Sequence, residues 1–152
     1  MKEKTFVTAP EALPDSRITK FIESRHIMTI ATVDAEGAPY CATVFYAYMK
    51  DENLLVFSSD SATHHYQHMV VDSRVAATIA LDTRVVGKIQ GVQITGRVEL
   101  PLDDRLSRAK NSYLKKFPYA ALSDLTLWIL RPLSIKFTDN RLGFGKKLLW
   151  HA

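Results

Sequence analysis

The chain has 152 residues, of which 47% are hydrophobic and 24% are charged, and its formal net charge is +4 at pH 7. This is the composition of a soluble globular domain, and it excludes a disordered or collagen-like chain. Because the sequence has no apolar run long enough for a membrane span, no apolar leader and no long basic run, we expect a cytoplasmic protein that binds neither membranes nor nucleic acid.

The sequence predicts one domain over residues 1–152, with residues 1–14 as a loose N-terminal arm. A short helix follows, because Asp15 or Ser16 can accept the first free backbone N–H groups of a helix. Its apolar positions recur at helical spacing and form one buried stripe: Ile18, Phe21 and Ile22.

The pattern then changes to that of strands. Residues 26–33 are rich in β-branched side chains and are apolar on both faces, as expected for a strand packed on two sides. Gly37 marks a hairpin turn into a second strand over 40–49, which is followed by a third over 54–59. Because these connections are short, the three strands form an antiparallel meander. The second strand carries aromatic residues on one face: Tyr40, Tyr46 and Tyr48.

The second half continues with a helix over 60–71, which Asp60 or Ser61 can cap, and with strands over 74–81 and 89–100. In the latter strand Gly91 and Gly96 indicate bends or a close approach of another backbone. Alternation places four of its residues on one face: Val92, Ile94, Val98 and Leu100.

A helix and one more strand complete the prediction. The helix carries an apolar stripe and ends before Pro118. The strand covers 128–138, where Pro132 favours an edge position or a bulge. The apolar stripe of the helix consists of Leu102, Leu106, Ala109, Tyr113 and Phe117. We therefore predict a mainly β fold, an antiparallel barrel of about five or six strands with about three short helices.

Three histidines, His64, His65 and His68, lie within five residues. His64 and His68 share one helix face, a geometry that zinc hydrolases use. Such a site needs a glutamate as general base, but the chain has Gln67 at that position and offers no third ligand. We therefore predict that the protein has no metal site and that these histidines lie at the surface or face a cofactor.

Other reactive groups give weak signals. Cys41, the only cysteine, lies inside a predicted strand, and we interpret it as a buried structural thiol. Neither a nucleophile elbow nor a glycine-rich phosphate loop is present. After Gly143 and Gly145, Lys146 and Lys147 could bind an anion, but we favour a turn that precedes a final apolar segment.

Hydroxyl groups cluster at 57–63, with the sequence FSSDSAT, between a predicted strand and a predicted helix. Hydroxyls and free N–H groups at a helix N-terminus can bind phosphate, because the positive end of the helix dipole is there. Ordinary helix capping explains the same residues equally well.

The order of these elements resembles the pyridoxamine 5′-phosphate oxidase-like superfamily, a family of split barrels, from about Ser16 onward. The ending KFTDNRLGFGKKLLW is similar to that of its small YhbP-type bacterial branch. Four further segments carry the resemblance: SRHIMTIATVDAEGAPYCATVFYA, LLVFSSDSATHHYQHM, GVQITGRVEL and WILRPLSIKFTDN.

The resemblance implies a homodimer that holds FMN at the subunit interface. The second strand would contact the flavin ring, the end of the third strand would follow, and the helix start would hold the phosphate. Gln93 is a further candidate for the ring or for the partner subunit. Carried over by position, the cofactor-binding residues are Thr43, Val44, Phe45, Tyr46, Phe57, Ser58, Ser59, Thr63 and His64.

The sequence also departs from the family. Typical members have an arginine near the position of Ala42 and a lysine near that of Ala47, and these charges are missing here. His64, His65 or the pair Lys146–Lys147 would have to compensate, because a phosphate dianion needs charged donors. The substrate-positioning Arg and His residues of the true oxidases also lack clear counterparts at the C-terminus. We therefore do not predict oxidation of pyridoxamine phosphate, and catalytic residues stay unassigned.

Three hypotheses about function remain. The first is a flavin-dependent oxidoreductase with a small-molecule substrate. The second keeps the fold and changes the ligand to haem or to a deazaflavin. The third is a dimeric binding protein without catalytic activity.

Overall fold

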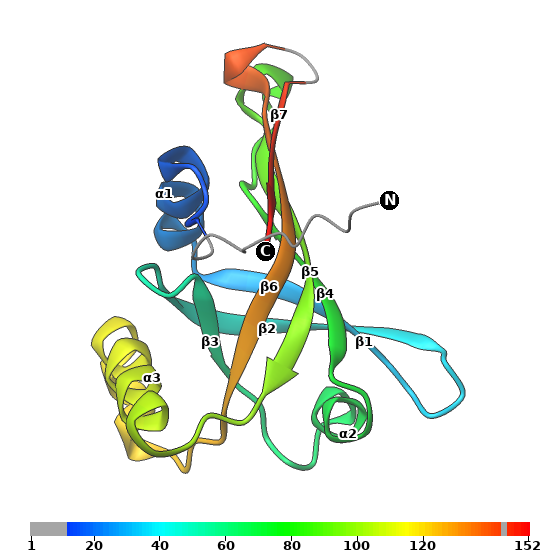
Figure 1. Ribbon diagram of the computed structural model, residues 1–152, viewed down its shortest axis with the longest axis vertical. Helices are drawn as coiled ribbons and strands as arrows, with labels where there is room; N and C mark the ends of the chain where they lie inside the picture. Colours follow the sequence, from blue (N-terminus) through cyan, green and yellow to red (C-terminus); the bar gives the residue numbers. More distant parts are fainter. Residues whose placement is uncertain (1–11, 144–145) are drawn as a thin grey trace, which may run out of the picture.

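The computed structural model describes residues 12–143 and 146–152. Their seven strands form one antiparallel sheet with the order β3-β2-β1-β4-β5-β6-β7 (Figure 1). An additional pairing of β3 with β6 closes the first six strands into a barrel, and β7 continues the sheet beyond it. The strands are β1 (Ile27–Val33), β2 (Pro39–Met49), β3 (Leu54–Ser58), β4 (Arg74–Ala80), β5 (Gln90–Glu99), β6 (Leu127–Asp139) and β7 (Lys147–His151).

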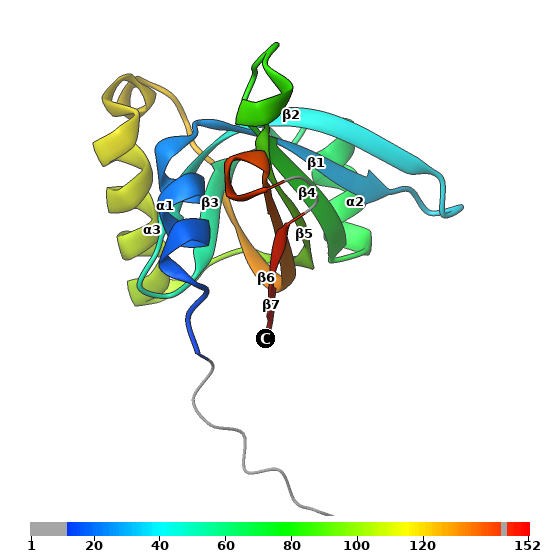
Figure 2. The same cartoon turned by 90° about the horizontal axis from the view of Figure 1, so that it is seen from above.

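Three α-helices surround the barrel (Figures 1 and 2). They are α1 (Ser16–Ser24), α2 (His64–Val71) and α3 (Asp103–Lys116), and short 3-10 turns occur at η1 (Val86–Lys88), η2 (Pro118–Leu122) and η3 (Asn140–Leu142). In Figure 1, α2 lies at the lower end of the barrel, and η1 and η3 form a tip at the opposite end. Within the described ranges, no helix has the length and apolar character needed to cross a membrane. The predicted mainly β barrel with three helices is confirmed.

Alternating side chains fill the interior of the barrel. On β5 the predicted inward set is buried at Val92, Ile94 and Val98, whereas Leu100 lies beyond the strand and is exposed. Two aromatic side chains, Tyr46 and Phe57, are completely buried in the same interior. A second apolar cluster lies between the outside of β3 and β6 and the helix α3.

Side chains cap the N-termini of the first two helices. Asp15 caps α1, as predicted, by accepting the backbone N–H of Arg17 at 2.8 Å. The predicted caps of the second helix were wrong, because α2 begins at His64 and Thr63 caps it. Asp60 instead accepts the backbone N–H of Ala62 at 2.8 Å and so belongs to a tight turn before the helix.

Pro132 lies at a bulge, one of the two predicted alternatives, and not on an edge strand. The register of β5 against β6 shifts after Thr95, so that Gly96 pairs with Pro132. A Cβ atom on Gly96 would collide with the carbonyl oxygen of Arg131 and lie 3.0 Å from Leu130 Cδ1. The predicted close backbone approach at this glycine is therefore confirmed.

Several sequence predictions about burial were wrong. Cys41 is exposed, because it faces outward on β2 in the long β1–β2 hairpin that extends past the barrel in Figure 1. Ile27 and Thr29 of β1 are exposed on the same outer face, so this strand is buried on one side only. Leu102 and Leu106 are 73% and 41% exposed, because only the second half of α3 packs against the sheet.

The C-terminal segment contains a strand that the sequence did not predict. The segment after the expected turn forms β7, which pairs with the second half of β6 from Thr138↔Lys147 to Ser134↔His151. At the other end of the chain, residues 1–11 of the predicted arm lie outside the described residues. The carbonyl oxygen of Ala12 accepts a hydrogen bond from the Trp150 indole at 2.7 Å, and Pro14 is buried.

Candidate functional site

One edge of β2 has no partner strand over half of its length. Residues Pro39–Phe45 pair with β1, whereas only Tyr46–Met49 pair with β3 on the other side. Along a strand, the backbone N–H and C=O groups of successive residues point alternately to its two sides. Some of the backbone groups of Tyr40–Phe45 therefore point to this free edge. Among the described residues no backbone group bonds to it. Such an edge offers donors and acceptors to a ligand.

The end of β3 and the start of α2 flank this free edge. The register places Ser58, the last residue of β3, alongside Phe45 of β2. Residues 59–63 then turn the chain into α2, where the His64 ring lies 5.5 Å from that of Tyr40 on β2. The three predicted parts of the site, which are the second strand, the end of the third strand and the helix start, therefore lie next to each other.

The hydroxyl groups of the turn are largely engaged within the protein. Thr63 Oγ1 donates to the carbonyl oxygen of Asp60 at 2.7 Å and accepts the backbone N–H of Tyr66 at 3.3 Å. Ser59 is 2% exposed and lies 3.3 Å from Thr63 between the two hydroxyl oxygens. Ser58 and His64 are thus the predicted residues of this turn whose side chains can reach a ligand.

His64 belongs to an aromatic cluster with Tyr40 and His68. The Tyr40 ring lies 5.5 Å from both imidazoles, and the two imidazoles lie 6.3 Å apart, all between ring centroids. His68 Nδ1 is hydrogen-bonded to the buried Thr32 hydroxyl at 2.9 Å, which fixes the orientation of its ring. In the described ranges no group of three or more His, Cys, Asp or Glu side chains is arranged to hold a metal ion.

His65 points in the other direction, into the protein. Its side chain is 9% exposed, and its Nε2 lies 3.4 Å from Thr63 Oγ1. Burial lowers the pKa of His65 below its ordinary value of 6.5, and the nearby His68 lowers this pKa further. His65 is therefore neutral near pH 7 and supplies no charge for an anion.

The lowered pKa of His65 predicts a loss of stability in mild acid. The unfolded chain takes up a proton on this residue near pH 6.5, whereas the folded protein resists it, so stability is complete above that pH and falls as the pH decreases below it. We expect urea unfolding at about pH 7.5 and about pH 5.5 to show a smaller acid-induced loss for His65→Gln than for the unchanged protein. His26→Gln, at an exposed histidine, is the control. Equal losses in all three proteins would contradict this assignment.

The other predicted residues divide between the interior and the surface. Tyr46 and Phe57 are fully buried and Val44 is 8% exposed, so their side chains cannot contact a ligand. Thr43 and Phe45 are exposed on the outer face of β2. Gln93 is exposed on β5, which is separated from β2 by β1 and β4. Gln93 therefore does not belong to this site within one chain.

Sequence analysis missed Lys116, at the end of α3. Its ammonium group donates to the carbonyl oxygens of Arg25 and Tyr46, the latter at 3.0 Å, and lies 4.6 Å from the centre of the Tyr46 ring. Burial lowers the pKa of Lys116 to about 8. Its neighbour Phe117 contacts Phe45 edge-on at 5.5 Å. A lysine at the end of an amphipathic helix gives no sign in the sequence that it will be buried.

Comparisons with known proteins agree with this architecture. The family model described as pyridoxamine 5′-phosphate oxidase matches residues 14–139. UPF0306 proteins of Yersinia pestis and Yersinia pseudotuberculosis are each 35% identical to the chain over 133 residues, which cover 88% of this chain and 90% of each relative.

Similar folds occur among solved structures. A haem-binding protein from Mycobacterium smegmatis superposes with a TM-score of 0.78 at 22% identity, over 95% of this chain and 60% of that one. HutZ, the haem storage protein of Vibrio cholerae, gives a TM-score of 0.62 at 17% identity, over 80% of this chain and 91% of HutZ. A Clostridium acetobutylicum protein of the pyridoxinephosphate oxidase family gives 0.63 at 15% identity, over 89% of this chain and 92% of that one.

Proposed function

This chain belongs to the pyridoxamine 5′-phosphate oxidase family, and we propose that it is a homodimeric flavin-dependent oxidoreductase that binds FMN along the free edge of β2. Its UPF0306 relatives fit the YhbP-type branch that the sequence resembles. The observation that carries the proposal is the free edge of β2 beside the start of α2. When bound, FMN would supply the transfer of a hydride or of electrons.

The residues at this edge suit a flat ring that has donors and acceptors along its rim. The free backbone N–H and C=O groups of Tyr40–Phe45 can bond to that rim, as a further strand would. The exposed side chains of Thr43 and Phe45 offer a hydroxyl and an aromatic surface beside the ring. The Lys116 ammonium group is held nearby on the Tyr46 carbonyl, next to the buried part of β2.

The start of α2 suits the phosphate. Its first backbone N–H groups carry the positive end of the helix dipole, and His64 at the first helical position is exposed. Because His65 is buried with a lowered pKa, and because the arginine and lysine of typical members are missing, His64 is the side chain of this turn that would supply charge.

Replacing His64 by alanine is expected to weaken FMN binding about tenfold, because one charged hydrogen bond to phosphate is lost. Riboflavin, which has the same ring and no phosphate, should bind the variant and the unchanged protein equally. Quenching of flavin fluorescence measures both affinities. His151→Ala, at an exposed histidine on β7, is the control. Equal weakening of FMN and riboflavin by His64→Ala would show that the phosphate is bound elsewhere.

The outer face of the sheet supports the proposed homodimer. Across β2, β1, β4 and β5 the register aligns small, uncharged, solvent-facing side chains, and Ile27 and Phe45 extend this face with 46% and 50% of their surface exposed. A flat uncharged face of this kind can pack against a second copy, with which each chain would complete the flavin site of the other. The aligned side chains are Thr29, Ala31, Cys41, Thr43, Ala76, Thr78, Gln93 and Thr95.

Haem is the second candidate ligand. The exposed His64 imidazole and the Tyr40 ring lie side by side, and both side chains occur as axial ligands of haem iron. Two structural neighbours are described as haem-binding and haem-storage proteins. On this alternative, added haemin would give a sharpened Soret band in the unchanged protein but not in His64→Ala, whereas FMN would leave both proteins colourless after dialysis.

A further inference from the structure

A hollow of about 560 Å³ lies between one face of α3 and the chain that leads from η2 into β6. Leu106, Lys110 and Leu114 follow one another at helical spacing and form its wall on α3, and residues 121–127 form the opposite wall. We call this hollow the α3 groove. Figures 1 and 2 show α3 on the side of the barrel away from α2 and from the tip of the β1–β2 hairpin. None of the residues that line the groove belongs to the candidate flavin site.

The apolar side chains of the α3 groove are open to a ligand. Leu106 has 41% of its surface exposed, and Leu114 and Leu125 are half-buried at the edge of the apolar cluster between α3 and the sheet. The predicted apolar stripe of α3 therefore continues from the core into an open hollow. Single apolar residues on a surface are common, but several that line one hollow are typical of a binding site.

Two side chains of opposite charge line the same hollow without pairing. Lys110 comes from α3 and Asp124 from the opposite wall, and both are exposed. In the described part of the chain neither has an ion partner within 4 Å, so they do not bind each other. By contrast, Arg108 on the same helix is paired with both Glu52 and Asp104. The groove thus offers a ligand an ammonium group on one wall and a carboxylate on the other.

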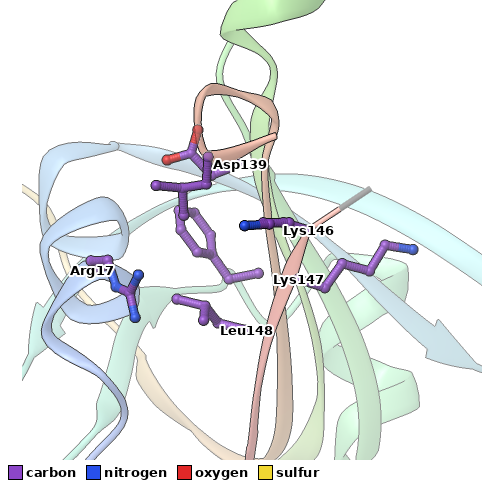
Figure 3. A pocket seen from close by; sticks show the side chains of 7 residues that line it. Arg17, Asp139, Lys146, Lys147 and Leu148 are labelled. Carbon is purple, nitrogen blue, oxygen red and sulfur yellow. The ribbon is translucent and has the colours of Figure 1, made fainter. Parts of the chain in front are cut away.

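A smaller hollow between α1 and β7 lacks this combination (Figure 3). Its volume is about 230 Å³, and its carboxylate, that of Asp139, is 3% exposed and paired with Arg141 at 2.9 Å. Arg17, which lines the same hollow, is paired with Asp15 at 2.9 Å. The charges that these four side chains carry are therefore already balanced within the protein, unlike those of the α3 groove.

We propose that the α3 groove binds a free amino acid with a large apolar side chain. The α-carboxylate lies at Lys110, the α-ammonium group lies at Asp124, and the side chain of the ligand packs on Leu106, Leu114 and Leu125. A zwitterion pairs with both charged groups at once, whereas a simple carboxylate or amine leaves one of them without a partner. The volume is that of a small-molecule site and has room for an aromatic or branched side chain.

L-Phenylalanine is the probe, and amide chemical shifts of the full-length protein in NMR measure its binding. We expect saturable shifts at residues of α3 and at residues 121–127. Glycine has the same two charges but no apolar side chain, and it should cause no saturable shifts at the same concentration. 3-Phenylpropanoate lacks the ammonium group and phenethylamine lacks the carboxylate, so each should bind about fivefold more weakly than phenylalanine.

Two variants separate the roles of the two charges. Lys110→Met keeps the apolar part of the side chain and should weaken binding of phenylalanine and 3-phenylpropanoate about fivefold, but not binding of phenethylamine. Asp124→Asn keeps the shape and should weaken phenylalanine and phenethylamine by about the same factor, but not 3-phenylpropanoate. Lys115→Met, at an exposed lysine of α3 that does not line the groove, is the control. Because all three side chains are exposed, unfolding curves of the variants should match that of the unchanged protein.

The absence of shifts at about 20 mM phenylalanine would overturn this assignment. Equal binding of all three compounds to the unchanged protein and to both groove variants would do the same. Shifts at these residues that follow the protein concentration and not the phenylalanine concentration would show that a second copy covers the groove instead. The assignment does not rest on the proposed flavin function, so phenylalanine should bind equally with and without saturating FMN. Displacement of phenylalanine by FMN would contradict a separate site.

Discussion

Thr78→Arg is expected to convert the proposed dimer into a 17.2 kDa monomer and to abolish the proposed FMN binding. Thr78 is on β4 at the centre of the small-residue outer face, paired with Thr29 on one side and with Gln93 on the other. In a two-fold interface the substitution buries two arginines close together, at a cost of roughly several kcal/mol. Sedimentation at micromolar concentration measures the change in mass.

The control for this variant is Ser107→Arg, which adds the same side chain at an exposed position of α3. It should leave both the dimer and flavin binding unchanged. A dimer that persists in Thr78→Arg would show that the outer face is not the interface. A monomeric Thr78→Arg that still binds FMN with full affinity would show that one chain suffices for the site.

Gly96→Ala is expected to destabilise the protein by about 2–3 kcal/mol. The added methyl group would overlap the backbone carbonyl oxygen of Arg131, and a backbone cannot rotate away as a flexible side chain can. The strain would act at the bulge where β5 meets β6, the strand that closes the barrel against β3. Thermal unfolding should show a decrease in Tm of about 5–10 °C.

Gly87→Ala provides the matched control, because no atom lies within 4 Å of a Cβ built on Gly87. This variant should have the stability of the unchanged protein within about 0.5 kcal/mol. If Gly96→Ala unfolds with the same midpoint as Gly87→Ala, the two strands must be able to separate at the bulge without cost.

Sequence patterns predicted the barrel where each element carries its own signal. The alternation of Val92, Ile94 and Val98 and the side-chain cap at Asp15 are local features, and both were found where expected. Strand β7 was missed because its five residues are stabilised by pairing with β6 and have no strong pattern of their own.

Errors about burial have a related cause. A strand sequence shows which residues share a face, but it does not show what covers that face. Cys41 therefore was predicted to be buried although its face of the hairpin is open, and Leu102 was assigned to a packed stripe although α3 meets the sheet only further along. Whether each of these two side chains is buried depends on where an element distant in the sequence ends.

For the candidate site, the resemblance pointed to segments that lie next to each other in the fold, but it did not show which of their side chains are accessible. The proximity of β2 and the start of α2 agrees with it, whereas Phe57 is buried because β3 is covered on both faces, and Ser59 directly after β3 is buried as well. The free edge of β2 was not foreseeable, because it depends on β3 being shorter than its neighbour. Lys116 was also not predicted, because the carbonyl oxygens that it binds lie far from it in the sequence.

Two copies of this chain, we propose, hold FMN at the free edge of β2. Titration of the cofactor-stripped protein with FMN, followed by flavin fluorescence and by the visible absorption spectrum after removal of unbound ligand, tests it most directly. We predict saturation at one FMN per chain, with flavin absorption bands that remain with the dimer. A protein that keeps no flavin and instead takes up haemin with a sharp Soret band would contradict the claim.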